Sequence, residues 1–148
     1  MAYFTYDTSV CISRNLTDFQ RMPRDFRLSA VVMMELMAGE PDESRRKFFG
    51  EICREYQRRN LVIVPTADDW LLSARVLYLL SDARRHLHKG KLKQLPAGAS
   101  QRLALDVLIA VSARRWKAQV VTENWADFKA IQRYCNTTII RAAQFFKT

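Results

Sequence analysis

The sequence predicts an α/β protein, a three-layer α/β/α sandwich around a central, mostly parallel sheet. Short apolar runs alternate with longer stretches of helical periodicity along the whole chain, which is the pattern of strands joined by crossover helices. Residues 61–64 form a fully apolar run, as expected for a strand covered on both faces. No internal repeat or linker-like stretch divides the chain, so residues 1–148 are expected to form a single domain.

The first half of the chain is expected to contain three strands and three longer helices. Strands are predicted at residues 3–6, 26–29 and 61–64, and helices at 31–38, from 41–43 to about 59, and from 66 onward. Gly39 ends the first of these helices, and Pro41 followed by two acids begins the next, because proline and acidic residues favour a first helical turn. Thr66, followed three residues later by Asp69, has the spacing of a capping box.

The second half is predicted to continue the same alternation. The apolar period lapses between residues 86 and 98, and residues 89–93 are expected to form an exposed connection. A helix is expected from residue 100 to about 117, a strand at 119–122, a helix at 124–134 and a strand at 137–140. Open parallel sheets bind ligands at the carboxyl ends of their strands, so residues that follow the strands are the candidates for a site.

Composition and charge exclude several classes of protein. Of the 148 residues, 49% are hydrophobic, which excludes an intrinsically disordered chain, and no apolar run approaches the ~18 residues that span a bilayer. The N-terminus lacks a basic start and a long apolar stretch, so no signal peptide is expected and the protein is predicted to be soluble and cytoplasmic. The 24 basic and 15 acidic residues give a net charge of +9, which favours a polyanionic or acidic partner.

The cysteines and histidines do not indicate a disulfide scaffold or a zinc site. The three cysteines form no C-x-x-C pair and have no histidines at ligand spacing, so reduced thiols are expected. His86 and His88 lie in a basic stretch and are interpreted as surface residues rather than as general acids or bases.

Two carboxylates occupy helical positions where leucine would be expected. Glu35 lies within the apolar run 30–37, and Asp106 lies within the apolar run 103–111, so both are expected to be buried. A buried, unpaired carboxylate costs several kcal/mol of desolvation, so each needs a cation, hydrogen bonds in the protonated form, or a metal ion. Arg102, one turn before Asp106, could pair with it or reach solvent, and at this point structural pairing and function stay equally open.

Two more acids follow predicted strands. Asp7 ends the first strand, and Asp127 follows the strand at 119–122, although both also suit a helix start, Asp7 as an N-cap and Asn124 as an N-cap with Asp127 three residues on. Four acids at one sheet edge would repel one another by roughly 3 kcal/mol per pair at ~5 Å and an effective dielectric constant of ~20, so their convergence would require a divalent cation. Oxygen ligands select Mg²⁺ or Mn²⁺ over zinc.

Four short motifs occur in an order that is similar to that of a known family. They are Asp7-Thr8-Ser9 after the first strand, Ser29 followed by Glu35-Leu36, Asp106 followed by Ile109-Ala110, and Thr122, Asn124 and Asp127-Phe128 after the late strand. With this length and charge, the chain resembles the PIN-domain nucleases, and within them the VapC-type toxins of bacterial type II toxin–antitoxin pairs.

The resemblance implies a site, a cofactor and partners. The implied catalytic and metal-binding acids are Asp7, Glu35, Asp106 and Asp127, with Thr8, Ser9, Thr122 and Asn124 in support. Relatives vary between the Asn124 and Asp127 positions for the fourth metal-site residue. The resemblance also implies Mg²⁺-dependent endoribonuclease activity on RNA, with Mn²⁺ as a possible substitute, a homodimer, and inhibition by a cognate antitoxin protein.

Two other functions stay open as alternatives. One is a catalytically silent PIN-fold module that binds RNA or protein. The other is a phosphoacceptor receiver domain, which needs an acidic pair near the N-terminus and a lysine after a late strand, where this chain has Asp7 alone and Thr122. Candidate RNA-binding clusters are residues 45–47, 84–85, 89–93 and 114–115, and Trp125 and Phe128 are candidates either for base stacking or for the core.

Overall fold

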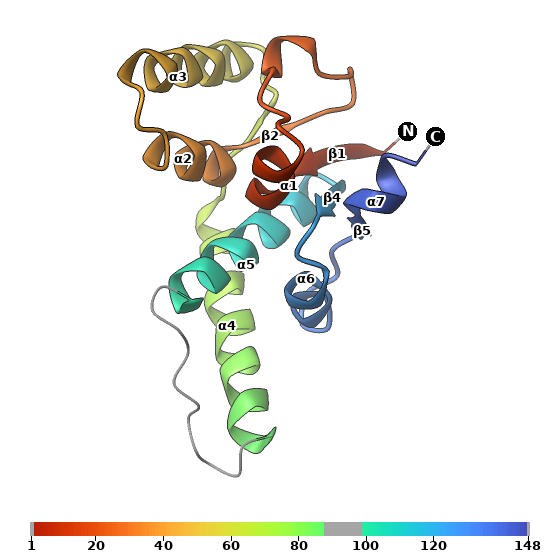
Figure 1. Cartoon of the computed structure of the whole chain (residues 1–148). Coiled ribbons are helices and arrows are strands. Elements are labelled where there is room, and N and C mark those ends of the chain that lie inside the picture. The colour runs from red at the N-terminus through yellow and green to blue at the C-terminus, as the bar shows by residue number, and fades with distance from the viewer. Residues whose placement is uncertain (1, 88–98, 148) are drawn as a thin grey trace.

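The structure is a computed structural model that describes residues 2–87 and 99–147 (Figure 1). In chain order its elements are β1 (Tyr3–Tyr6), α1 (Thr8–Ser13), the 3-10 helix η1 (Phe19–Arg21), β2 (Leu28–Ser29), α2 (Ala30–Ala38), α3 (Glu43–Arg58), β3 (Val62–Ile63), α4 (Ala67–Leu87), α5 (Ala99–Arg115), β4 (Ala118–Thr122), α6 (Trp125–Gln132), β5 (Ile139–Arg141) and α7 (Ala142–Phe145). The predicted exposed connection at residues 89–93 lies outside the described residues.

The strands form a parallel sheet. β1 pairs with β4, β4 pairs with β5, and β2 pairs with β3, all in parallel. A parallel bridge between Phe4 and Phe26 joins the two groups of strands, and the Arg27 N–H donates a 2.8 Å hydrogen bond to the Phe4 carbonyl. The spatial order is therefore β3-β2-β1-β4-β5, so the chain direction across the sheet reverses at β1, as in doubly wound folds.

Helices cover both faces of this sheet. Successive strand residues point to opposite faces, and both Val120 and Val121 in β4 are 0% exposed. α5 packs against β4, α7 packs against β4 and β5, and α4 lies alongside α5 (Figure 1). The predicted fold class, a three-layer sandwich around a parallel sheet, is confirmed.

The predicted elements are present, with shifted ends. β3 is shorter than the predicted strand at 61–64, β5 is shifted one to two residues beyond the prediction, and α4 continues past residue 86, where its periodicity lapses. The sequence did not predict η1 or α7. The tail that contains α7 is held by aromatic contacts, since the Phe145 ring centroid lies 5.0 Å from that of Phe4 and 6.1 Å from that of Tyr6.

The cysteines agree with the expectation of reduced thiols. Cys11, Cys53 and Cys135 are all free, and the first and last are buried. Burial, with a smaller contribution from the nearby Asp7 charge, raises the pKa of the Cys11 thiol to about 12. Among the described helices, none combines the length and the apolar character that crossing a membrane requires.

The start of α4 is fixed by the predicted capping box. The Thr66 N–H donates to Asp69 Oδ2 at 2.9 Å, and the Asp69 N–H donates to Thr66 Oγ1 at 3.2 Å. Asp69 is only 6% exposed and also accepts a 3.0 Å hydrogen bond from Arg115 Nε at the end of α5. This one carboxylate therefore caps α4 and ties it to α5, the helix that carries Asp106.

Replacing this carboxylate should destabilise the protein. We expect Asp69→Ala to lower the free energy of unfolding by roughly 2 kcal/mol, because it removes a helix cap and takes the carboxylate partner from the Arg115 guanidinium, which keeps only its bond to the Val64 carbonyl. At this chain length that loss corresponds to a decrease in Tm of about 4–8 °C, measurable by thermal unfolding. Asp68→Ala, an exposed change in the same helical turn, is the matched control, and an equal loss in both variants would contradict this assignment.

Candidate active site

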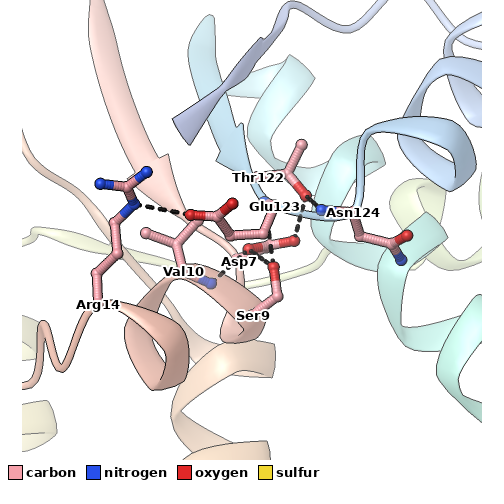
Figure 2. A network of polar contacts seen from close by, with 7 residues as sticks. All are labelled: Asp7, Ser9, Val10, Arg14, Thr122, Glu123 and Asn124. Carbon is pink, nitrogen blue, oxygen red and sulfur yellow. Dashed lines mark hydrogen bonds and ion pairs between the residues drawn. The ribbon is translucent and has the colours of Figure 1, made fainter. Parts of the chain in front are cut away.

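The site begins where β1 and β4 end. Tyr6 pairs with Val121 in the parallel register, so Asp7 and Thr122 follow side by side at the carboxyl edge of the sheet. Thr122 Oγ1 donates a 2.6 Å hydrogen bond to Asp7 Oδ2, and both residues are buried (Figure 2). The strand pairing therefore places the first predicted acid against the last predicted motif, 115 residues away in the chain.

Asp7 accepts two further hydrogen bonds from the start of α1. Ser9 Oγ donates to Asp7 Oδ1 at 2.7 Å, and the Val10 N–H donates to the same oxygen at 3.1 Å (Figure 2). Asp7 is thus the N-cap of α1, so its interpretation as a cap is confirmed, and it lines the cleft described below as well. Burial raises the pKa of Asp7, and its hydrogen bonds from Thr122, Ser9 and Val10 oppose this effect.

Glu35 reaches the same region from α2. Its Oε1 accepts a 2.8 Å hydrogen bond from Thr8 Oγ1, the first residue of α1. Burial raises the pKa of Glu35, the hydrogen bond from Thr8 opposes this, and the charge of Asp7 raises the pKa further. Glu35 was expected to be buried, but the residue is only half-buried, because it lines a cleft rather than the apolar core.

Asp106 and Asp127 share one amide. Asn124 Nδ2 donates to Asp106 Oδ2 at 3.2 Å and to Asp127 Oδ2 at 3.0 Å. Asn124 occupies the N-cap position of α6, but its side chain makes no capping bond and turns to the two acids instead. Asp106, which was also expected to be buried, is half-buried at the cleft. Arg102 is exposed and lines the cleft, and the ion pairs between described residues include none that joins it to Asp106.

The carboxylates perturb one another most strongly at Asp106. Burial is the main cause that raises the pKa of Asp106 to about 7, and the charges of Asp7, Glu35 and Asp127 raise it further. The hydrogen bond from Asn124 lowers it. The four acids therefore lie close enough to interact electrostatically, although they come from four separate segments of the chain.

These side chains surround one open cleft of about 580 Å³. Its lining is Asp7, Thr8, Ser9, Ile12, Glu35, Arg102, Leu103, Asp106, Asn124 and Asp127. All four predicted acids and three of the four predicted supporting residues are thus brought together. The fourth, Thr122, lies behind Asp7, where its hydroxyl donates to that carboxylate and accepts a 2.8 Å hydrogen bond from the Asn124 N–H (Figure 2).

The oxygen atoms in the cleft suit a hard cation that keeps part of its water shell better than one that has lost all of its water ligands. Over residues 2–87 and 99–147, no three Asp, Glu, His or Cys side chains are placed to hold one ion together. Mg²⁺ keeps several of its waters and needs only one or two carboxylates as direct ligands. The cleft supplies carboxylate oxygens and the neutral amide oxygen of Asn124, and no cation in the described part of the chain pairs with these carboxylates. The residues present therefore fit Mg²⁺ or Mn²⁺ with water between some of the ligands and the ion.

A contact that the sequence did not predict borders the site. Arg14 Nε donates to Glu123 Oε1 at 2.7 Å, and the Arg14 guanidinium lies 4.8 Å from the Phe146 ring centroid. The Glu123 N–H donates to Ser9 Oγ at 3.3 Å, and Figure 2 shows the Glu123 side chain extending toward Arg14, away from Asn124. Since 109 residues separate Arg14 from Glu123, no local pattern could have indicated the pair.

The candidate RNA-binding residues have different outcomes. Arg45 pairs with Glu40, and Arg115 pairs with Asp69, so carboxylates of the protein neutralise these two arginines. The side chains of residues 84–85 and of His86, and all of 89–93 and His88, lie outside what the structure describes. Phe128 is fully buried, so its core interpretation is confirmed, whereas Trp125 is half-buried at the start of α6.

Solved structures resemble this architecture along nearly its whole length. VapBC-1 from nontypeable Haemophilus influenzae contains a chain that matches 95% of this chain over 98% of its own length, with 19% identity and a TM-score of 0.54. The structure of FitAB bound to an IR36 DNA fragment contains a chain that matches 94% of this chain over 94% of its own, with 17% identity and a TM-score of 0.53. The chain has a PIN-like fold. No protein-family model and no curated protein matches the sequence.

Within this PIN-like fold, the stability of the protein should report the ionisation of Asp106. The folded protein holds the Asp106 proton more tightly than an unfolded chain does, because its pKa of about 7 lies above the ordinary value. This proton therefore contributes to the free energy of unfolding in full below about pH 4, and the contribution is lost as the pH rises through about 7. We expect Asp106→Asn to be more stable than the wild type by roughly 1–3 kcal/mol at pH 8 and nearly equal at pH 4.

Urea unfolding at the two pH values measures this difference, without added metal. Glu51→Gln, an exposed change on α3, is the control and should follow the wild type at both pH values. A variant that is less stable than the wild type at pH 8 would show that Asp106 is held by a compensating interaction and not desolvated.

Proposed function

We propose that the protein is a Mg²⁺-dependent endoribonuclease that hydrolyses RNA phosphodiester bonds and acts as the toxin of a type II toxin–antitoxin pair. The observation that carries the proposal is the convergence of Asp7, Glu35, Asp106 and Asp127 on one cleft. The cleft lies at the carboxyl edge of a parallel sheet, where such folds bind their ligands. The charges of Asp7, Glu35 and Asp127 raise the pKa of Asp106, and no cation among the described residues pairs with these acids, so their grouping is costly without a function that uses their charge.

In this proposal Asp7, Glu35 and Asp106 hold Mg²⁺, or Mn²⁺ in its place, directly or through water. Asp127 completes the site or orients the attacking water, and Asn124, bonded to both Asp106 and Asp127, fixes the distance between them. When bound, the metal activates water and stabilises charge on the leaving oxygen. Thr8, Ser9 and Thr122 orient the carboxylates with neutral hydroxyl donors, which leave the negative charge available to the cation.

The partners are proposed from the fold neighbours and the charge. VapBC and FitAB are complexes of a toxin with an antitoxin, which supports an antitoxin protein as partner of this chain. The +9 net charge supports a polyanionic substrate such as RNA. We also propose that the protein forms a homodimer and acts in the cytoplasm.

Cleavage of RNA with and without chelator tests the activity. We expect a structured RNA to be cut in Mg²⁺ and to stay intact in EDTA, and we expect Asp7→Asn to lose roughly 10²–10⁴-fold in rate, since metal positioning supplies several kcal/mol. Gel analysis of the products measures the rate, and circular dichroism checks that the variant is folded. Binding of RNA without cleavage by the wild type would favour the alternative, a catalytically silent PIN-fold module.

Expression in bacteria tests the toxin role separately. We expect the wild-type protein, produced alone, to arrest growth, and Asp106→Ala to relieve the arrest, because the variant lacks one of the proposed metal-holding acids. Growth curves after induction, at matched protein levels, make the comparison, with Glu51→Gln as the variant that should stay toxic. Arrest that persists in Asp106→Ala would separate toxicity from the acid cleft.

A further inference from the structure

Two cations lie over one tryptophan next to the acid cleft. The Arg141 guanidinium lies 4.6 Å from the Trp125 ring centroid, and Lys129 Nζ lies 5.3 Å from it. Trp125 is half-buried and packs against the core, whereas Arg141 and Lys129 are exposed. We name these three residues the cationic patch.

The fold places the cationic patch at the same sheet edge as the acids. Arg141 is the last residue of β5 and pairs in register with Thr122, whose hydroxyl donates to Asp7. Two strand spacings, about 10 Å, therefore separate the backbone of Arg141 from that of Asp7. Trp125 directly follows Asn124, which lines the cleft, and Lys129 lies one helical turn further along α6.

The charges of the patch are not neutralised. Among the described residues, no carboxylate pairs with Arg141 or Lys129, and Lys129 Nζ instead donates to the neutral Gln132 Oε1 at 3.1 Å. Other basic side chains are paired, as Arg14 is with Glu123. An aromatic ring holds a cation in place through its quadrupole without cancelling its charge. The patch thus offers two oriented positive charges beside a cleft lined with acids.

A polyanion that approaches this cleft needs those charges. The four carboxylates repel the phosphates that flank a bound segment of RNA, and this repulsion must be offset by cations close to the cleft. We propose that Arg141 and Lys129 bind a backbone phosphate of the RNA next to the one that lies in the cleft, and that Trp125 is the positioning residue that holds both. This inference rests on the proposed function and assigns the contact to the backbone, so it predicts no base preference.

Salt-dependent binding of a labelled single-stranded RNA tests the proposal. Binding is measured by fluorescence anisotropy in EDTA, so that neither metal nor cleavage contributes. Because the proposal gives both cations to one phosphate, Arg141→Gln/Lys129→Gln is expected to weaken affinity about fivefold at 0.1 M salt and to reduce the slope of log K against log [salt] by about 0.7. Trp125→Leu should reduce the slope in the same way, and Trp125→Phe, which keeps an aromatic face, should retain most of it.

The control variant removes the same charge elsewhere. Arg24→Gln/Arg54→Gln takes two exposed cations from the loop before β2 and from α3, so it should change the slope far less than the patch variant does. Equal slopes for the patch and control variants would overturn the proposal, since the effect would then be one of net charge. An unchanged slope in Trp125→Leu, with a Tm equal to that of the wild type, would overturn the role of Trp125.

The two proposals fail in different ways. If the wild type does not cleave RNA in Mg²⁺ but its binding in EDTA depends on Arg141 and Lys129, the proposed nuclease function fails and the patch stands. If the wild type cleaves RNA and the patch variant binds it with an unchanged slope, the patch fails and the nuclease function stands.

Discussion

The hydrogen bond between Thr122 and Asp7 is the contact on which the rest of the site depends. It forms because β1 and β4 run parallel and end together, so a residue from each end of the chain meets its counterpart at a buried edge. The Thr122 hydroxyl also accepts the Asn124 N–H, which sets the start of the segment that carries Asn124 and Asp127. One hydroxyl therefore aligns two motifs that the sequence separates by more than a hundred residues.

The donors to the carboxylates in this cleft are all neutral. Ser9, Thr122 and the Val10 N–H donate to Asp7, Thr8 donates to Glu35, and Asn124 donates to Asp106 and Asp127. Neutral donors fix the direction of a carboxylate and offset part of its desolvation, but they leave its charge in place. A lysine or arginine paired with these carboxylates would neutralise their charge and occupy the place of the proposed metal ion. The donor set thus fits a site that sacrifices stability for charge.

The sequence allowed the members of the site to be predicted, but not the way they are held. Asp7 and Asp127 could be predicted because the carboxyl ends of parallel strands meet at one edge, and Glu35 and Asp106 because acids are costly in apolar helices. The prediction that Glu35 and Asp106 are buried was wrong, because a helix that is apolar on all sides does not indicate in which direction its one acid points. The orientation of the Asn124 side chain could not be predicted either. An asparagine at a helix start has the sequence signature of a cap whether or not its side chain makes the capping bond. Neither the pair between Arg14 and Glu123 nor the packing of Phe145 on β1 has a local signal, because each depends on tertiary structure alone.

The distribution of charge around the cleft follows from a single requirement. A basic protein that holds four acids together risks pairing them with its own cations, which would fill the place of the proposed metal ion and remove the charge that would attract it. Arg14 is prevented from doing so by Glu123 and the Phe146 ring, whereas Arg141 and Lys129 are held over Trp125. Glu123 neutralises the charge of Arg14, whereas the Trp125 ring leaves the charges of Arg141 and Lys129 in place. Arg141 and Lys129 are therefore the cations that stay available for the proposed phosphate contact. The fold thereby places Arg141 at the same sheet edge as Asp7, with their backbones about two strand spacings apart, while the Arg141 side chain is held over Trp125.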